Sequence, residues 1–433
     1  MDWLTALSKR KSSLVQFSDW TRNRRVSTLG TNAGATPLPF QNWHRFKEAY
    51  TPELIGRAVQ ESTIPVRHLV DAFGGSGTSA LSAQFLGIAS TSIEVNPFLA
   101  DVIRAKITYY ESDALIHDLG KVVRHVKRTS ASVRRFSACP ATFIEPGING
   151  RYLFHAAIAE CLASIQTAIE TLKVEAHRRF FRVLLGGILV AVSNVRISGK
   201  GRRYRQGWQN RKIDPVEVLD LFVQSALQAI VEVHAHMNRP RTEATVLTSD
   251  ARIAINEVEP ADLIVFSPPY PNSFDYTDVY NLELWMLGYL GSPQNNHALR
   301  FSTLSSHVQI KRNFAPMPDG SKSLSQSVKR LHERRDALWS PWIPEMIGGY
   351  FADMSRVLTG CAHRLNDGGQ IWMVVGNSQY AGVVVAVDQI LIELAPRWNL
   401  RFIVKKPFRS MRVSAQQGGK EQLAETLVIL AKD

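Results

Sequence analysis

The chain has 433 residues, 45% of them hydrophobic and 21% charged, and this composition excludes a mostly disordered, collagen-like or coiled-coil protein. At about 150 residues per domain, the length allows two or three domains with a large buried core. Lysine and arginine exceed aspartate and glutamate by 13. A positive field of that size favours polyanionic partners, nucleic acid first and an anionic membrane surface second.

Cysteine use and hydropathy narrow the class of protein further. Cys139, Cys161 and Cys361 are far apart and form no CxxC pair. This spacing disfavours a disulfide framework and a structural zinc site, and it fits a reducing cytoplasm. The longest apolar stretch, Val183 to Val192, is shorter than the roughly 20 residues of a membrane span and predicts a buried helix. No secretory signal is visible, and the scattered histidines have no metal-ligand spacing.

The first predicted elements form a strand–turn–helix–strand unit. Residues 1–36 are rich in lysine and arginine and are predicted to be a basic N-terminal arm. Val66–Phe73 is an apolar run that ends in glycines, which indicates a buried strand. Thr78–Gly87 has helical spacing, and Ala89–Ile93 is a second strand. This succession is typical of a parallel sheet in an α/β fold.

The strand signal lapses from about residue 99 to 240, where leucine, alanine and isoleucine follow helical spacing. Further strands are predicted at 244–248, 262–266, 370–375, 400–404 and 426–430. The simplest architecture is one α/β sheet domain, residues 37–104 and 241–433, with two insertions. The first, residues 105–240, is helical, and the second, residues 290–345, is polar and basic.

A glycine-rich turn between the first strand and helix is the first candidate site. It reads Asp71-Ala-Phe73-Gly74-Gly75-Ser76-Gly77-Thr78. Glycines there let backbone N–H groups approach a ligand, and the helix N-terminus attracts an anionic group. Glu94, at the end of the next strand, is suitably spaced to accept hydrogen bonds from two ribose hydroxyls. Together they predict an adenosine-type cofactor. The absence of GxGxxG and GK[ST] disfavours a dinucleotide or a nucleoside triphosphate.

A second motif, Ser267-Pro268-Pro269-Tyr270, directly follows the predicted strand 262–266. The two prolines fix the backbone and lack N–H donors, so carbonyl acceptors, a hydroxyl and an aromatic ring stand at the carboxyl end of a strand. Ligands of such sheets bind at that edge. The group suits a flat ring with an amino substituent, although a proline-stiffened loop with a core tyrosine is the competing interpretation. For Phe274, Tyr276 and Tyr280, packing is the preferred interpretation.

In combination, the two motifs resemble the DNA amino-methyltransferases, which transfer a methyl group from S-adenosylmethionine to N4 of cytosine or N6 of adenine. The resemblance covers most of the sheet domain and implies a Rossmann-like class I methyltransferase sheet with a large helical insertion. The segment from Phe46 to Leu54 is similar to the family's segment that closes over the methionine end of the cofactor. The motif order excludes the permuted form that begins with the catalytic motif. The chain ends after its last strand, so recognition is expected from the insertions.

The resemblance also implies roles for single residues. Glycines and Asp71 shape the methionine pocket, Glu94 binds the ribose and Asp250 binds the adenine amine. Ser267 and the carbonyl of Pro268 accept hydrogen bonds from the target amine, and Tyr270 stacks on a base flipped out of the duplex. The implied catalytic residues are Ser267, Pro268, Pro269 and Tyr270. The implied cofactor-binding residues are Phe46, Tyr50, Thr51, Pro52, Asp71, Phe73, Gly74, Gly75, Ser76, Gly77, Thr78, Glu94, Asn96 and Asp250.

A basic run from residue 196 to 212 is the predicted contact with nucleic acid. It has no acidic residue, and Tyr204 and Trp208 are interleaved with its cations, a composition that fits phosphate contacts. Its glycines predict a flexible loop, and a solvated surface loop is the alternative. The predicted contact residues are Arg196, Lys200, Arg202, Arg203, Arg205, Arg211 and Lys212.

The expected function is therefore site-specific methylation of double-stranded DNA at N4 of cytosine. Serine before Pro-Pro-Tyr goes mostly with cytosine in this family. Methylation of adenine N6 is the first alternative, and RNA methylation or a non-catalytic binding module are the others. Glutamine methylation is disfavoured by the positive charge and by Ser267. No membrane partner or metal is expected. Cognate restriction or defence proteins are candidate partners, and the expected location is the nucleoid in the cytoplasm.

Overall fold

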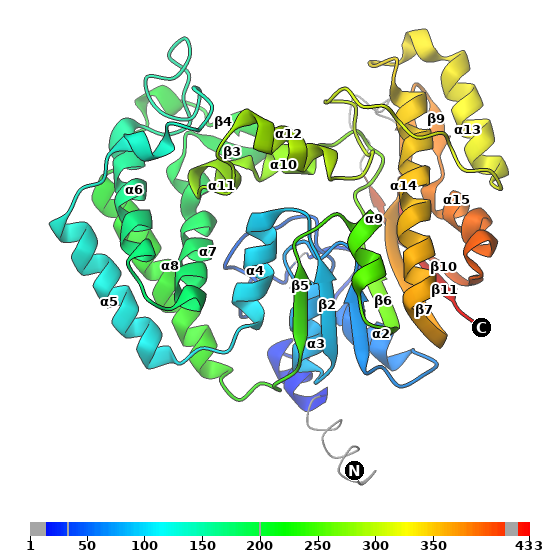
Figure 1. Ribbon diagram of the computed structural model, residues 1–433, viewed down its shortest axis with the longest axis horizontal. Coiled ribbons are helices and arrows are strands. Elements are labelled where there is room, and N and C mark those ends of the chain that lie inside the picture. The colour runs from blue at the N-terminus through cyan, green and yellow to red at the C-terminus, as the bar shows by residue number, and fades with distance from the viewer. Residues whose placement is uncertain (1–13, 33, 199–200, 412–422) are drawn as a thin grey trace.

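A seven-stranded mixed sheet runs through the middle of the protein in the computed structural model, which describes residues 14–32, 34–198, 201–411 and 423–433 (Figure 1). The strand order is β10-β11-β7-β6-β1-β2-β5. Neighbouring strands from β5 to β7 are parallel, whereas β11 is antiparallel to both β7 and β10. The strands are β1 (His68–Asp71), β2 (Ala89–Ile93), β5 (Ala244–Leu247), β6 (Ala261–Phe266), β7 (Leu365–Gly376), β10 (Arg401–Met411) and β11 (Leu423–Ala431).

These strands confirm the predicted α/β class and all seven predicted sheet strands. Alternate residues of the central strands point to opposite faces, as the two-residue period of a strand requires. Leu263 and Val265 of β6 belong to the core on one face, and Ile264 and Phe266 belong to the core on the other. The sheet is therefore buried between two helical layers, which explains why its strands read as continuous apolar runs.

Helices cover both faces of the sheet (Figure 1). The first core includes residues of α2 (Pro52–Gln60), α3 (Thr78–Phe85) and α4 (Pro97–Ile107). The second core contains residues of α9 (Ala251–Ala254), α13 (Lys322–Glu333), α14 (Ile343–Arg364) and α15 (Val387–Leu394). Short helices α10 (Tyr276–Val279), α11 (Asn281–Met286) and α12 (Pro293–Phe301) follow β6. A small hairpin of β8 (Ser378–Tyr380) and β9 (Val383–Val385) follows β7.

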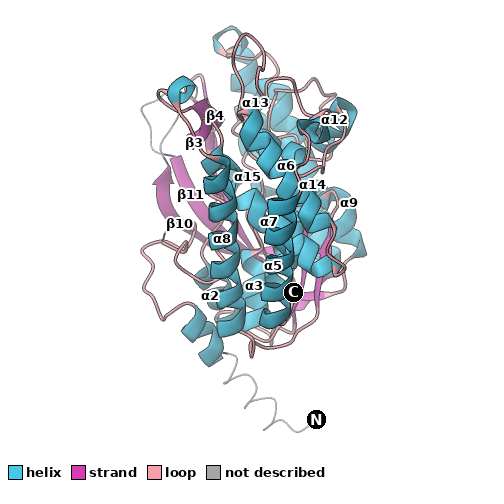
Figure 2. Ribbon diagram, turned by 90° about the vertical axis from the view of Figure 1, so that its left-hand side faces the viewer, coloured by secondary structure: helices cyan, strands magenta, loops and turns pink. Residues whose placement is uncertain are grey.

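The predicted helical insertion contains four long helices (Figure 2): α5 (Ser112–Arg128), α6 (Ala156–Glu170), α7 (Glu175–Val192) and α8 (Pro215–Ala235). The stretch from Val183 to Val192 lies in α7, as predicted. Asp214 caps α8 by accepting a hydrogen bond from the backbone N–H of Val216 at 2.8 Å. These helices share one continuous hydrophobic core with α2, α3 and α4. Within the described residues, no helix is both long and apolar enough to cross a bilayer.

Phe17 and Trp20 of the predicted arm belong to the hydrophobic core, while residues 1–13 lie outside the described part of the chain. Residues 14–20 are helical, and Trp20 is only 1% exposed. Its indole stacks on the ring of Phe85 in α3, with ring centroids 4.5 Å apart and an interplanar angle of 3°. The basic composition of this segment therefore gave no indication that Trp20 is buried in the hydrophobic core.

Candidate functional site

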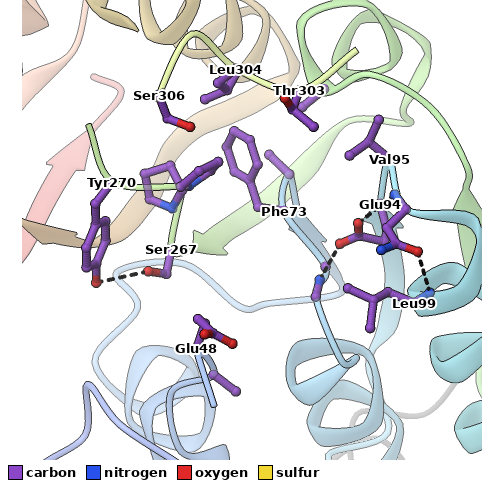
Figure 3. A pocket seen from close by; sticks show the side chains of 18 of the residues that line it. Glu48, Phe73, Glu94, Val95, Leu99, Ser267, Tyr270, Thr303, Leu304 and Ser306 are labelled. Carbon is purple, nitrogen blue, oxygen red and sulfur yellow. Dashed lines mark hydrogen bonds between the residues drawn. The ribbon is translucent and has the colours of Figure 1, made fainter. Parts of the chain in front are cut away.

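One cavity of about 700 Å³ lies where the carboxyl ends of β1, β2 and β6 meet, the edge at which ligands bind in such sheets (Figure 3). It brings together the glycine-rich turn, Glu94 and the Ser-Pro-Pro-Tyr motif, although up to about 200 residues separate them. The predicted site residues that line it are Phe46, Tyr50, Asp71, Phe73, Gly74, Gly75, Ser76, Thr78, Glu94, Asn96, Asp250, Ser267, Pro268, Pro269 and Tyr270.

Three predicted cofactor residues, Thr51, Pro52 and Gly77, are not among the lining residues of this cavity. Thr51 and Pro52 are buried at the start of α2. Gly77 has a φ of +83°, and a Cβ atom there would lie 3.2 Å from the Cα of Ile103. Its glycine therefore serves the turn and the close approach of α4. These three residues therefore lie beside the lining residues in the chain without lining the cavity themselves.

Asp71 is a buried carboxylate at the end of β1 that already has several hydrogen-bond donors. Its Oδ2 accepts from the Tyr50 hydroxyl at 2.9 Å and from the Ser79 hydroxyl at 2.5 Å, and its Oδ1 accepts from the Phe73 N–H at 2.9 Å. Burial raises the pKa of Asp71 to about 6, against the opposing effect of these donors. Asp71 thus ties the segment containing Tyr50 to the glycine-rich turn.

Glu94 bridges two backbone segments around the cavity (Figure 3). Its Oε2 accepts from the Gly75 N–H at 2.7 Å, and its Oε1 accepts from the Asn96 N–H at 2.8 Å. Burial raises the pKa of Glu94 to about 7. Each carboxylate oxygen keeps lone-pair capacity for a further donor, such as a ribose hydroxyl. Asn96 caps α4, because its side-chain oxygen accepts from the N–H groups of Phe98 and Leu99 at 3.0 and 3.2 Å.

Asp250 lines the cavity, but its carboxylate is also engaged by a neighbouring arginine. The Arg252 guanidinium donates to both carboxylate oxygens, from Nη2 at 2.6 Å and from Nε at 3.0 Å. Arg252 also pairs with Asp353 of α14 at 3.1 Å. Asp250 additionally caps α9 by accepting from the Arg252 N–H at 2.9 Å. Any adenine amine at Asp250 would share the carboxylate with this ion pair.

The Ser-Pro-Pro-Tyr motif continues directly from buried strand β6. The Ser267 hydroxyl donates to the carbonyl of Val374 at 2.9 Å, and the Tyr270 hydroxyl lies 3.3 Å from Ser267 Oγ. The Tyr270 hydroxyl donates to Glu425 of β11 at 2.9 Å. The motif therefore presents two oriented hydroxyl groups beside the proline carbonyls, which suits the recognition of an amino group.

Several cavity residues were not predicted from the sequence. Glu48 lies between Phe46 and Tyr50 in the chain, and Tyr280 donates a hydrogen bond to its carboxylate. Burial raises the pKa of Glu48. Phe46 stacks on Tyr280, with ring centroids 5.2 Å apart. Phe274 and Tyr280 pack in the core, as expected, and both also line the cavity. The unpredicted lining residues also include Glu425, Ser302, Thr303, Leu304, Ser306 and His307.

The basic run forms a hairpin of β3 (Val195–Ser198) and β4 (Gly201–Tyr204) followed by a short 3-10 helix, where the sequence predicted a flexible loop. Arg205 and Arg211 donate to backbone carbonyls at the end of α7, among them those of Val190 and Ser193. Arg202 lies 3.6 Å from Asp278 and packs over an aromatic ring. Three of the predicted contact residues therefore have partners within the protein.

Arg196 and Arg203 differ from these three arginines. They are exposed and directly opposite one another across the hairpin. Like charges in that arrangement repel, and a bound anion would relieve the repulsion. Lys212 is exposed as well, whereas Lys200 lies outside the described residues. The six predicted contact residues that the structure describes are not among the residues that line the cavity.

The chain is similar in sequence to several known proteins. No protein-family model matches it. It is 26% identical to the Type II methyltransferase M.AvaI of Nostoc sp. and to that of Anabaena variabilis, over 91% of this chain and 86% of each relative. It is 23% identical to the Type II methyltransferase M.BsoBI of Geobacillus stearothermophilus, over 96% of this chain and 87% of the relative. The resemblance predicted from the motifs is confirmed at the level of a DNA methyltransferase: over most of its length, this chain is similar to proteins named Type II methyltransferases.

Proposed function

We propose that the protein is a site-specific DNA methyltransferase that transfers the methyl group of S-adenosylmethionine to N4 of a flipped-out cytosine. The observation that carries this proposal is the single cavity shared by the Asp71–Thr78 turn, Glu94 and the Ser267–Tyr270 motif. A methyl transfer between two substrates requires their sites to adjoin. The sheet order, with β11 antiparallel to its neighbours, supports a Rossmann-like class I methyltransferase fold.

The half of the cavity around β1 and β2 fits an adenosine-type cofactor. Glu94 offers carboxylate oxygens for ribose hydroxyls, and Gly75, which also lines the cavity, adopts the positive φ that the turn requires. Phe46, whose ring would lie 3.0 Å from a Cβ atom at Gly75, closes the other side. When bound, S-adenosylmethionine supplies an electrophilic methyl group. These residues would hold it with that group toward the Ser-Pro-Pro-Tyr motif.

The chemical task of the motif is to make an exocyclic amine nucleophilic, because the lone pair of that nitrogen is delocalised into the base. Ser267 Oγ and the Pro268 carbonyl can accept the two amino hydrogens and draw the nitrogen toward tetrahedral geometry. The amine then takes the methyl group by in-line displacement, the C–S bond breaks, and an amine proton leaves to water. The ring of Tyr270 would replace the stacking that the base loses on flipping.

Charge supports DNA as the second substrate. The net charge of +13 attracts a polyanion, and Arg196, Arg203 and Lys212 are exposed together near the hairpin. We propose that residues 105–240 and the basic segment 290–345 flank the duplex and include the recognition surfaces. Because the relatives are named Type II methyltransferases, a cognate restriction enzyme is the proposed biological partner.

Methylation of adenine N6 is the first alternative, since either amine can use the same acceptors, and RNA is the second. Incubation with radiolabelled S-adenosylmethionine and duplex DNA, RNA or no acceptor distinguishes the substrate classes. We expect the radiolabelled methyl group to be retained on DNA alone. Label on RNA alone, or on neither acceptor, would contradict it.

A further inference from the structure

Ser267, Tyr270 and Glu425 form a chain of hydrogen-bonding groups along one wall of the cavity. Figure 3 shows the contact between Ser267 and Tyr270. Ser267 Oγ lies 2.9 Å from the Val374 carbonyl oxygen and 3.3 Å from the Tyr270 hydroxyl. The Tyr270 hydroxyl lies 2.9 Å from Glu425 Oε1. Glu425 comes from β11, near the end of the chain, and is only 3% exposed. It therefore reaches the motif from a strand that carries none of the predicted site residues.

Counting protons fixes the direction of these hydrogen bonds. Serine and tyrosine hydroxyls each have one proton, whereas a carbonyl and an ionised carboxylate only accept. With the Ser267 hydroxyl donating to the Val374 carbonyl and the Tyr270 hydroxyl donating to Glu425, the Ser267 oxygen keeps its lone pairs available as acceptors. Ser267 can then accept a hydrogen bond from an amino group.

Without an acceptor at position 425, the Tyr270 proton has Ser267 Oγ within reach, at 3.3 Å. A hydrogen bond from Tyr270 to Ser267 would take one of the two lone pairs of that oxygen and compete with the target amine for it. The position of Glu425 is also constrained, because a Cβ atom at Gly30 would lie 2.7 Å from its Oε2. The absence of a side chain at Gly30 thus leaves room for the carboxylate beside the Tyr270 hydroxyl.

We propose that Glu425 is a positioning residue: it accepts the hydrogen bond of the Tyr270 hydroxyl and thereby leaves Ser267 available to accept a hydrogen bond from the target amino group. This inference rests on the proposed methyl transfer to an exocyclic amine. Glu425 would then affect the rate of methyl transfer through its hydrogen bond with Tyr270, without contacting the substrates itself.

The test is a double-mutant cycle of E425L and Y270F, with kcat, the KM for DNA and the cofactor affinity measured for each variant. E425L should lower kcat about tenfold, the effect of one misdirected hydrogen bond, with little change in KM. In the Y270F background, E425L should lower kcat no further, because no competing proton remains. E425Q, which keeps an acceptor oxygen, should stay within about threefold of the wild type.

E393Q is the matched control. Glu393 also accepts hydrogen bonds from hydroxyl groups, those of Ser321 and Ser323, but it does not line the cavity. It should leave kcat unchanged. An E425L effect of equal size in both backgrounds, or E425L and E425Q with wild-type kcat, would overturn the inference while the proposed function stood. A wild-type protein that transfers no methyl group to DNA would instead overturn the proposed function.

Discussion

Glu94, at the carboxyl end of β2, accepts a hydrogen bond from the backbone N–H of Gly75, 2.7 Å away in the turn that follows β1. The two strands are parallel neighbours, so their carboxyl ends meet at one edge of the sheet. This contact joins the acid and the glycine-rich turn that the sequence assigned to a single cofactor site.

Replacing Glu94 with alanine should weaken S-adenosylmethionine binding. The loss of charge-assisted hydrogen bonds to the ribose hydroxyls should raise the free energy of binding by about 1.5–3 kcal/mol. Isothermal titration calorimetry on the folded variant measures this directly. Unchanged affinity in a folded E94A protein would remove Glu94 from the cofactor site.

The affinity for the cofactor should also depend on pH. Burial raises the pKa of Glu94 to about 7, so the group loses its charge as pH falls through that value. Only the ionised form accepts with both oxygens, so affinity should rise between pH 6.5 and 8, where Asp71, with a pKa of about 6, is mostly ionised. Titrations of wild type and E94Q across this range provide the check. An equal rise in E94Q would assign the pH dependence to another group.

Neutralising the exposed arginines of the hairpin should weaken DNA binding, whereas neutralising the arginines bonded to the end of α7 should lower stability. R196Q combined with R203Q should lower the slope of log affinity against log salt by about 1.8, at roughly 0.9 per phosphate contact. R205Q combined with R211Q removes hydrogen bonds to carbonyls at the end of α7 and should lower the melting temperature while leaving the slope unchanged. DNA binding at several salt concentrations, with thermal melts, separates the two. An unchanged slope for R196Q/R203Q would make the hairpin an ordinary solvated surface.

Trp20 should stabilise the sheet domain, although it lies in a segment with the composition of a free basic arm. W20A removes an indole stacked on Phe85 and leaves a cavity, which should cost about 3–5 kcal/mol of unfolding free energy. Denaturant unfolding of wild type and W20A measures the difference. A change below about 0.5 kcal/mol, the usual range for surface positions, would mean that the segment is not anchored in solution.

The sheet and the cavity's main motifs could be predicted because their signals are local. The apolar run before Ser267 indicates a buried strand, as does the short segment Ala89–Ile93, and the glycines indicate the turn. The β3–β4 hairpin was missed because each strand has only four residues, and the apolar alternation of Val195 and Ile197 does not continue into β4, which reads Gly-Arg-Arg-Tyr.

The rest of the site depends on contacts between distant segments. Nothing beside Glu425 in the chain indicates that it meets Tyr270, 155 residues earlier. Composition alone likewise made Arg205 and Arg211 equivalent to Arg203, although two of the three are engaged with the end of α7. The charge of an arginine can be read from the sequence, whereas the groups that bond to that arginine are known only from the folded structure.

Base identity in methylated DNA tests the central claim most directly. The purified protein is incubated with unmodified DNA and S-adenosylmethionine, and the DNA is digested to nucleosides for mass spectrometry. S267A, which removes an acceptor whose effect is largest in the transition state, serves as a slow control that should retain cofactor affinity. We expect N4-methylcytosine, formed much more slowly by S267A. N6-methyladenosine without N4-methylcytosine would contradict the assigned base, and DNA without any added methyl group would contradict the proposed function.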